Sequence, residues 1–106
     1  MDKNELLNNN INDLNIAHAI ATDIKNDSLK KYTIDRLKSM NENLNLFQNT
    51  DISLLVDSYI IDITLLINVS KISNMIEEKD YFKSKLIDLM NKFPNLKERK
   101  DLVDLL

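Results

Sequence analysis

The sequence contains no glycine, no cysteine and no tryptophan, and it has one proline, Pro94. Without cysteine, the chain has no disulfide framework and no cysteine-ligated zinc site. Without glycine, it has no P-loop and no dinucleotide-binding fingerprint, because both motifs need glycine where the backbone approaches phosphate. These absences exclude several classes of cofactor-dependent enzyme, and we expect neither a cofactor nor a metal ion.

The length of 106 residues is typical of one domain, and we expect residues 1–106 to form a single helical domain. With 43% hydrophobic residues, 29% charged residues and a net charge of −3, the composition is that of neither a membrane protein nor a disordered chain. Asparagine, isoleucine and lysine are abundant, which indicates an AT-rich genome such as that of a low-GC bacterium, a phage, another mobile element or a parasite. Because this bias also removes glycine, the periodicity of the apolar residues carries the fold prediction.

Apolar residues recur at steps of three and four along most of the chain, as Leu7, Ile11 and Leu14 show in the first segment. This is the spacing of amphipathic helices, and it predicts an all-α fold, a small antiparallel bundle of four to five helices. The helices are expected at about 3–25, 28–48, 51–77, 80–93 and 95–105. No internal repeat and no linker is found.

Short polar side chains mark the expected helix starts, because they accept hydrogen bonds from the first free backbone amides. Asp2 and Glu5 fit a capping box, and Ser28 and Thr50 are the expected caps of the next two helices. Asp80 is the candidate cap of a fourth helix, although one long helix running through to residue 93 is the alternative. Pro94 ends that segment and suits the first turn of a last helix.

Segment 51–77 is apolar around almost its whole helical circumference, which is typical of a buried, central helix. A small bundle has difficulty surrounding one helix, because small domains bury only about 60% of their surface. We therefore expect this helix to contact another chain, as a homodimer or with a different protein. A membrane span is not expected, because Asp57, Asp62 and Asn68 interrupt the segment. The N-terminus has no secretion signal, so we expect a cytoplasmic protein.

The expected partner-binding residues are large apolar side chains of segment 51–77 and of the segment that follows it. They are Tyr59, Ile60, Ile63, Ile67 and Phe82. Polar residues of the same helix fall on two roughly opposite lines. The first line contains Ser53, Asp57, Thr64, Asn68 and Lys71, and the second contains Ser58, Asp62 and Ser73. These lines are either two edges in contact with solvent or a polar seam that sets the register of a partner.

Residues suited to catalysis are few. His18, the single histidine, lies in the middle of the first apolar stripe, where it is either a core or boundary imidazole or a pH-sensitive contact. No serine lies in a nucleophile-elbow context, and neither arginine has a histidine five residues later, the spacing of one group of helical ribonucleases. We therefore expect no enzymatic activity.

The charge distribution supports an alternative function. Residues 71–100 contain eight basic and five acidic residues, whereas residues 1–70 contain six basic and ten acidic. The candidate nucleic-acid contacts are Lys79, Lys83, Lys85, Lys92, Lys97, Arg99 and Lys100. Because acids interrupt this segment, the favoured hypothesis is a non-enzymatic protein that binds another protein, of the inhibitor, immunity, antitoxin or adaptor type. Nucleic-acid binding or regulation is the alternative.

Overall fold

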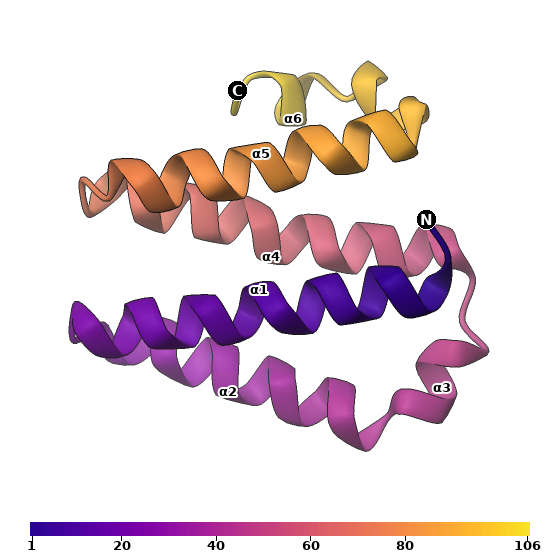
Figure 1. Ribbon diagram of the computed structural model, residues 1–106, viewed down its shortest axis with the longest axis horizontal. Coiled ribbons are helices and arrows are strands. Elements are labelled where there is room, and N and C mark those ends of the chain that lie inside the picture. The colour runs from indigo at the N-terminus through magenta and orange to yellow at the C-terminus, as the bar shows by residue number, and fades with distance from the viewer. The chain divides into compact units, whose positions relative to one another are not determined.

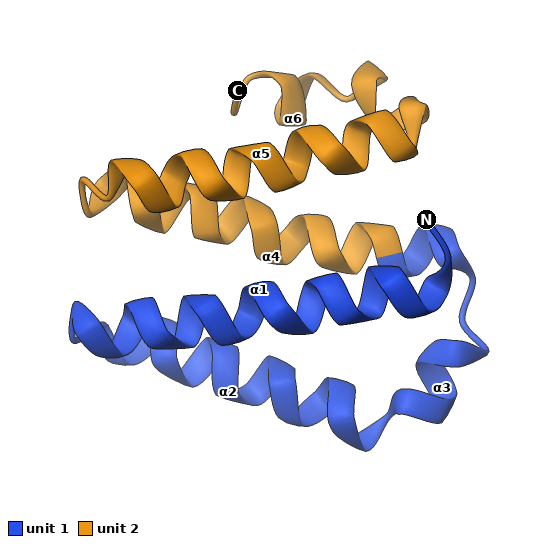
Figure 2. Cartoon of the chain, in the orientation of Figure 1, with its two compact units in different colours: residues 1–55 blue, residues 56–106 orange.

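The computed structural model describes residues 1–106, and all of its regular structure is helical (Figure 1). The helices are α1 (Lys3–Asp23), α2 (Asp27–Glu42), α3 (Leu44–Gln48), α4 (Ile52–Ile72), α5 (Ile76–Lys92), the 3-10 helix η1 (Pro94–Glu98) and α6 (Lys100–Val103). The predicted all-α fold is confirmed. The chain divides into two compact units, residues 1–55 and 56–106, which are described separately below (Figure 2).

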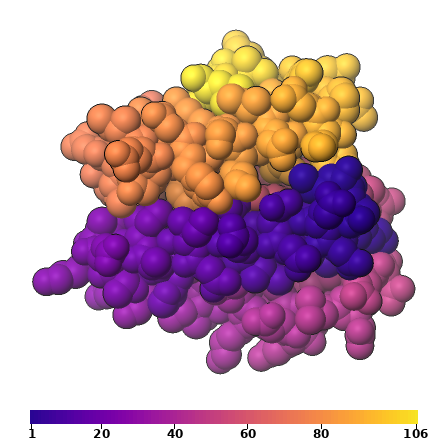
Figure 3. Space-filling view, in the orientation of Figure 1, coloured from indigo at the N-terminus to yellow at the C-terminus, as the bar shows by residue number.

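In the first unit, α1 and α2 form a helical hairpin, and their side chains close the space between the two ribbons (Figure 3). The buried positions of α1 recur at helical spacing and form one face toward the interior. They are Leu6, Leu7, Asn10, Asp13, Leu14, Ala17 and Ala21. The short helix α3 follows α2, and the Lys3 Nζ atom donates a 3.2 Å hydrogen bond to the Gln48 carbonyl, which joins the end of α3 to the start of α1.

The helix α4, of 21 residues, begins at the end of the first unit and continues through the second, where the chain turns back so that α4 and α5 form a second hairpin (Figure 1). Its interior contains large side chains, including Tyr59, Ile63, Phe82 and Leu86, each at most 1% exposed. The 3-10 helix η1 and the short α6 complete the unit. Leu96 and Leu102 anchor these two elements, since both side chains are buried.

Both hairpins turn in the same way. Lys25 and Asn74 have φ angles of 56° and 57°, the left-handed conformation that ends many helices and that glycine usually adopts. After α1, the amide of Asn26 donates to the carbonyl of Ala21 at 2.9 Å. After α4, the amide of Met75 donates to the carbonyl of Ser70 at 2.8 Å. These are Schellman turns, formed here without glycine.

Corresponding elements of the two hairpins are offset by 49 residues: α1 and α4 begin at 3 and 52, and α2 and α5 begin at 27 and 76. Every buried residue of α1 has a buried counterpart 49 residues later. Few of these pairs have the same residue at both positions. Two that do are Leu6 with Leu55 and Asp13 with Asp62. The molecule therefore contains a structural repeat that the sequence does not reveal, because burial repeats while residue identity does not.

Several helix boundaries differ from the predicted ones. The expected helix 28–48 is divided at Asn43, whose side-chain amide donates to the carbonyl of Ser39 at 2.8 Å. The expected helix 51–77 ends at residue 72 because Asn74 is left-handed, and the next helix begins at 76 rather than 80. The expected helix 95–105 is a 3-10 turn followed by one short α-helical turn. Pro94 does begin that segment, as predicted.

The helix caps are also corrected in part. Asp2 caps α1 as predicted, accepting a 2.8 Å hydrogen bond from the amide of Glu5. Asn26 rather than Ser28 caps α2, by accepting from the amide of Leu29 at 3.0 Å. Asp51 rather than Thr50 caps α4, and Asp80 lies inside α5. For α2 and α4, an acceptor side chain one or two residues from the predicted cap accepts the hydrogen bond from the free amide, whereas Met75, which precedes α5, makes no side-chain capping bond.

Candidate functional site

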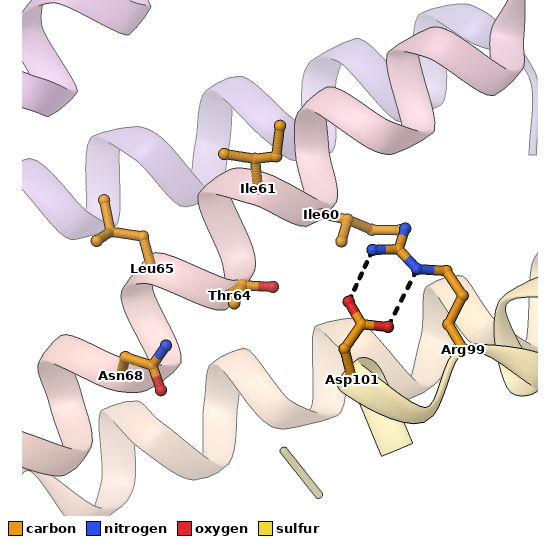
Figure 4. A pocket seen from close by; sticks show the side chains of 7 residues that line it. All are labelled: Ile60, Ile61, Thr64, Leu65, Asn68, Arg99 and Asp101. Atoms are coloured by element: carbon orange, nitrogen blue, oxygen red, sulfur yellow. Dashed lines mark hydrogen bonds and ion pairs between the residues drawn. The ribbon is translucent and has the colours of Figure 1, made fainter. Parts of the chain in front are cut away.

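A groove lies on the outward side of α4, within the second unit (Figure 4). Its volume is about 380 Å³. It is lined by Ile60, Ile61, Thr64, Leu65, Asn68, Arg99 and Asp101. Successive turns of α4 supply the first five residues, and the segment after η1 supplies the last two. The floor is mainly aliphatic, and the charged groups lie at one end.

That charged end is organised around Arg99. Its Nη2 atom lies 2.8 Å from Asp101 Oδ2, and its Nε atom donates to Asp101 Oδ1 at 3.3 Å, so that the two side chains form a bidentate pair (Figure 4). The Nη1 atom also approaches Asp57 Oδ1 of α4 at 3.8 Å. The hydrogen bonds from Arg99 lower the pKa of Asp101 below its ordinary value. Arg99 thus links the C-terminal segment to the N-terminal half of α4.

The outward side of α4 carries four apolar side chains. We refer to Leu54, Ile61, Leu65 and Ile72 as the α4 stripe. Three of them are exposed large hydrophobic residues, at 60% for Leu54, 64% for Ile61 and 82% for Ile72, and the fourth is half-buried. Isolated exposed apolar residues are common on protein surfaces, but a row along one helix face is a feature of interaction surfaces.

Of the residues predicted to bind a partner, Ile60 lines the groove, and none belongs to the α4 stripe. Tyr59, Ile60, Ile63, Ile67 and Phe82 are all buried, none more than 2% exposed. The sequence could not separate these residues from the α4 stripe, because α4 is apolar on both sides. The exposed side chains of the stripe have the same residue types as the buried ones, so no signal in the sequence distinguishes them.

The first predicted polar line follows the edge of the groove. Thr64 and Asn68 line it, and Asp57 is the residue approached by Arg99. In the second line, Asp62 is buried, at 1% exposure, whereas Ser58 is half-buried and Ser73 is exposed, so only part of this line is in contact with solvent. Every buried side-chain nitrogen or oxygen of the protein has a hydrogen-bond partner.

The predicted basic residues are not gathered on one side of α5. With about 3.6 residues per turn, Lys79 and Lys83 lie on one side of the helix, and Lys85 and Lys92 lie on nearly the opposite side. The ammonium group of Lys85 lies 5.5 Å from the ring centroid of Tyr81, a cation–π distance. The remaining basic residues, Lys97, Arg99 and Lys100, are exposed in the C-terminal segment, where Arg99 is paired as described.

Two further features bear on chemistry. His18 is half-buried in α1, and no group of three or more histidine, aspartate or glutamate side chains is arranged to hold a metal ion. By length and composition α4 is the one helix that would be able to cross a membrane, and 44% of the relevant window is buried inside the protein. Core helices share this property, so it is weak evidence for a membrane span.

Comparisons with family models, with curated proteins and with solved structures find no match for this chain. The features of this chain that bear on its function are therefore the groove, the α4 stripe and the different residues at corresponding positions of the two hairpins.

Proposed function

We propose that the protein is not an enzyme and that it acts by binding protein through the α4 stripe and the adjoining groove. An inhibitor, immunity protein, antitoxin or adaptor works in this way, and self-association through the same helix belongs to the proposal. Apolar side chains along one helix face bury hydrophobic area when a partner helix packs on them, which favours association by about 25 cal/mol per Å² removed from water. The Arg99–Asp101 pair at the end of the groove offers the polar rim that such interfaces have.

The observation that carries the proposal is the difference between α4 and its counterpart α1. The residues of α1 that lie 49 positions before Leu54, Ile61 and Ile72 are the polar Glu5, Asn12 and Asp23. These three residues are exposed, as are their counterparts in α4. A hairpin of this kind therefore forms with polar residues at these positions. The apolar residues in α4 are not needed for the hairpin, and contact with a partner explains them.

The polar residues of α1 at these positions also define a variant of α4 that tests the proposal. Leu54→Glu, Ile61→Asn and Ile72→Asp together place the residues of α1 on the corresponding positions of α4 and leave the buried face unchanged. The matched control is Ile87→Lys, which replaces an exposed isoleucine of α5 with the residue at the corresponding position of α2, Lys38.

The test is affinity capture from the native host with the wild type, the triple variant and the control, followed by mass spectrometry. We expect a specific protein to be captured by the wild type and the control and to be lost with the triple variant. Capture that is unchanged in the triple variant contradicts the proposal. Recovery of nucleic acid alone, released by salt, would favour the alternative function of segment 79–100.

A further inference from the structure

We infer that the α4 stripe binds a second copy of this chain, with the two α4 helices packed antiparallel and centred between Ile61 and Leu65. The inference rests on the proposed function and adds the identity, direction and register of the partner helix.

The spacing is that of a coiled coil. Along the outward side of α4, residues 54, 58, 61, 65, 68 and 72 are separated alternately by four and three positions. This is the heptad alternation that keeps one seam of a helix facing a partner helix over several turns. Leu54, Ile61, Leu65 and Ile72 supply the apolar positions of the seam, and Ser58 and Asn68 supply the polar ones. None of these six side chains is fully buried.

The seam is complementary to itself when one copy is reversed. In the register centred between residues 61 and 65, Leu54 faces Ile72 of the second copy, and Ile61 faces Leu65. The polar Ser58 faces Asn68, whose amide can both donate and accept. Apolar residues thus meet apolar residues in four of the six layers, and the other two layers, which the twofold axis relates, each pair Ser58 with Asn68. A polar layer of this kind fixes the register of helix pairs.

Charge selects the antiparallel direction. Asp57 and Lys71 lie on the same edge of the seam, 14 residues apart, and Thr64 lies midway between them. Reversal brings Asp57 of one copy opposite Lys71 of the other at both ends, with Thr64 near the twofold axis. Parallel packing would instead place Asp51 and Asp57 of both copies at one end, where like charges repel. Antiparallel packing also opposes the two helix dipoles.

The structure shows why α1 cannot form such a pair. Its corresponding seam is Glu5, Asn9, Asn12, Ile16, Ala19 and Asp23. Acidic residues at both ends would face each other in the same antiparallel register. The second hairpin therefore carries a self-complementary surface that the first hairpin lacks.

Disulfide trapping tests the direction and the register, because the chain has no native cysteine. Leu54→Cys and Ile72→Cys are prepared as single variants at exposed positions and oxidised separately and as a mixture. We expect crosslinked dimers only in the mixture. In the antiparallel pair, position 54 lies about 27 Å along the axis from position 54 of the other copy, at ~1.5 Å per residue. A disulfide needs Cα atoms within about 7 Å.

Two results would overturn the register. Crosslinking of Leu54→Cys with itself indicates a parallel pair, and no crosslink in the mixture indicates that these ends do not meet. A mixture of Leu54→Cys with Ile87→Cys is the control, and it should give no crosslink above the background of random collision. Lys71→Asp should weaken dimerisation about two- to thirty-fold, since exposed ion pairs contribute about 0.2–1 kcal/mol each and the dimer contains two.

Sedimentation equilibrium of the unmodified chain separates this inference from the proposed function. We expect a dimer for the wild type and for Ile87→Lys, and a monomer with unchanged helical circular dichroism for the triple variant. A monomeric wild type overturns the second copy as partner, while the host capture experiment still decides the proposed function. Co-sedimentation with phosphatidylglycerol vesicles that the triple variant loses would overturn both, because it assigns the stripe to a lipid surface.

Discussion

The first hairpin, α1 with α2, and the second, α4 with α5, have the same pattern of helices and turn but are built from different residues. Each has a first helix of 21 residues that begins at a capping aspartate and ends in a left-handed turn residue. The buried positions of α1 recur in α4, whereas most of the residues at those positions differ. The comparison shows that the pattern of burial, rather than particular residues, specifies the hairpin.

The interiors differ in side-chain size. Ala17 and Thr33 of the first hairpin correspond to Leu66 and Phe82 of the second, and all four side chains are buried. Small residues allow close approach of helix backbones, and large residues bury more apolar area per residue. The two hairpins therefore depend on different contributions to packing, although their outline is the same.

The outer faces differ in polarity, and this is the difference on which the proposed function is based. Three exposed positions that hold polar residues in α1 hold apolar residues, also exposed, in α4. The second unit also extends beyond its hairpin to Arg99 and Asp101, which close one end of the groove. The α4 stripe and the groove therefore belong to the second hairpin, and the corresponding face of α1 carries Glu5, Asn12 and Asp23.

The largest expected effect contrasts the interiors. Phe82→Ala should lower the free energy of unfolding by about 3–5 kcal/mol, because it leaves a cavity in the second hairpin. Thr33→Ala, at the corresponding position, should cost about 1 kcal/mol, since it removes a methyl group and the 2.9 Å hydrogen bond to the Lys30 carbonyl. Urea denaturation of both variants measures the difference. Equal losses would show that the two interiors are equivalent after all.

A second variant enlarges a buried side chain of the first hairpin, whereas Phe82→Ala shortens one of the second. Ala17→Leu places the residue of the corresponding α4 position into α1, where the existing side chain is fully buried. We expect a loss of about 1–3 kcal/mol from overpacking, measured by thermal denaturation. Ala19→Leu, at an exposed position of the same helix, is the control and should be nearly neutral. An increase in stability on Ala17→Leu would mean that the first hairpin has unfilled space.

The two turns supply a smaller contrast. Lys25→Gly should raise the free energy of unfolding by up to about 1 kcal/mol, because glycine adopts a positive φ angle without the steric cost of a Cβ atom. Asn74→Gly should gain less, since asparagine tolerates this conformation better than lysine does. Denaturant midpoints of the two variants check the order. A loss of stability for Lys25→Gly would contradict the assigned turn conformation.

The smallest expected effect concerns the cap of α4. Hydrogen bonds from the Ser53 amide and hydroxyl, at 2.9 and 2.8 Å, lower the pKa of Asp51 below its ordinary value of 3.8. The associated stability is present above pH 3.8 and is lost as the pH falls through the lowered pKa of the folded state. In Asp51→Asn this part of the pH dependence should disappear. Thermal melts of both proteins between pH 2 and pH 5 measure it, and identical profiles would contradict the prediction.

Features that depend on local chemistry were predictable from the sequence. Asp2 caps α1 because its carboxylate reaches an amide three residues away, whatever the rest of the chain does. Pro94 begins the 3-10 turn because its ring restricts φ and removes a donor. The apolar spacing identified the long helices correctly for the same reason, since a helical period can be read within one segment.

Breaks made by less restrictive residues were harder to place. Asn74 carries no requirement for a left-handed conformation, and a continuous helix through segment 73–75 was an equally good interpretation of its sequence. The division at Asn43 is a similar case. The structural repeat was missed because most counterparts share burial and not residue type, and burial is a property of the packed molecule.

The sequence by itself determined that this chain is all-helical and that it lacks the residues for phosphate loops and cysteine chemistry, because a missing residue and a local hydrogen bond need no tertiary context. Only the tertiary structure decided which side of α4 is interior. The helix is apolar on both sides, so its own residues contain no preference. Packing buries Tyr59, Ile63 and Ile67 and leaves Leu54, Ile61 and Ile72 exposed, and the candidate binding surface follows from that choice.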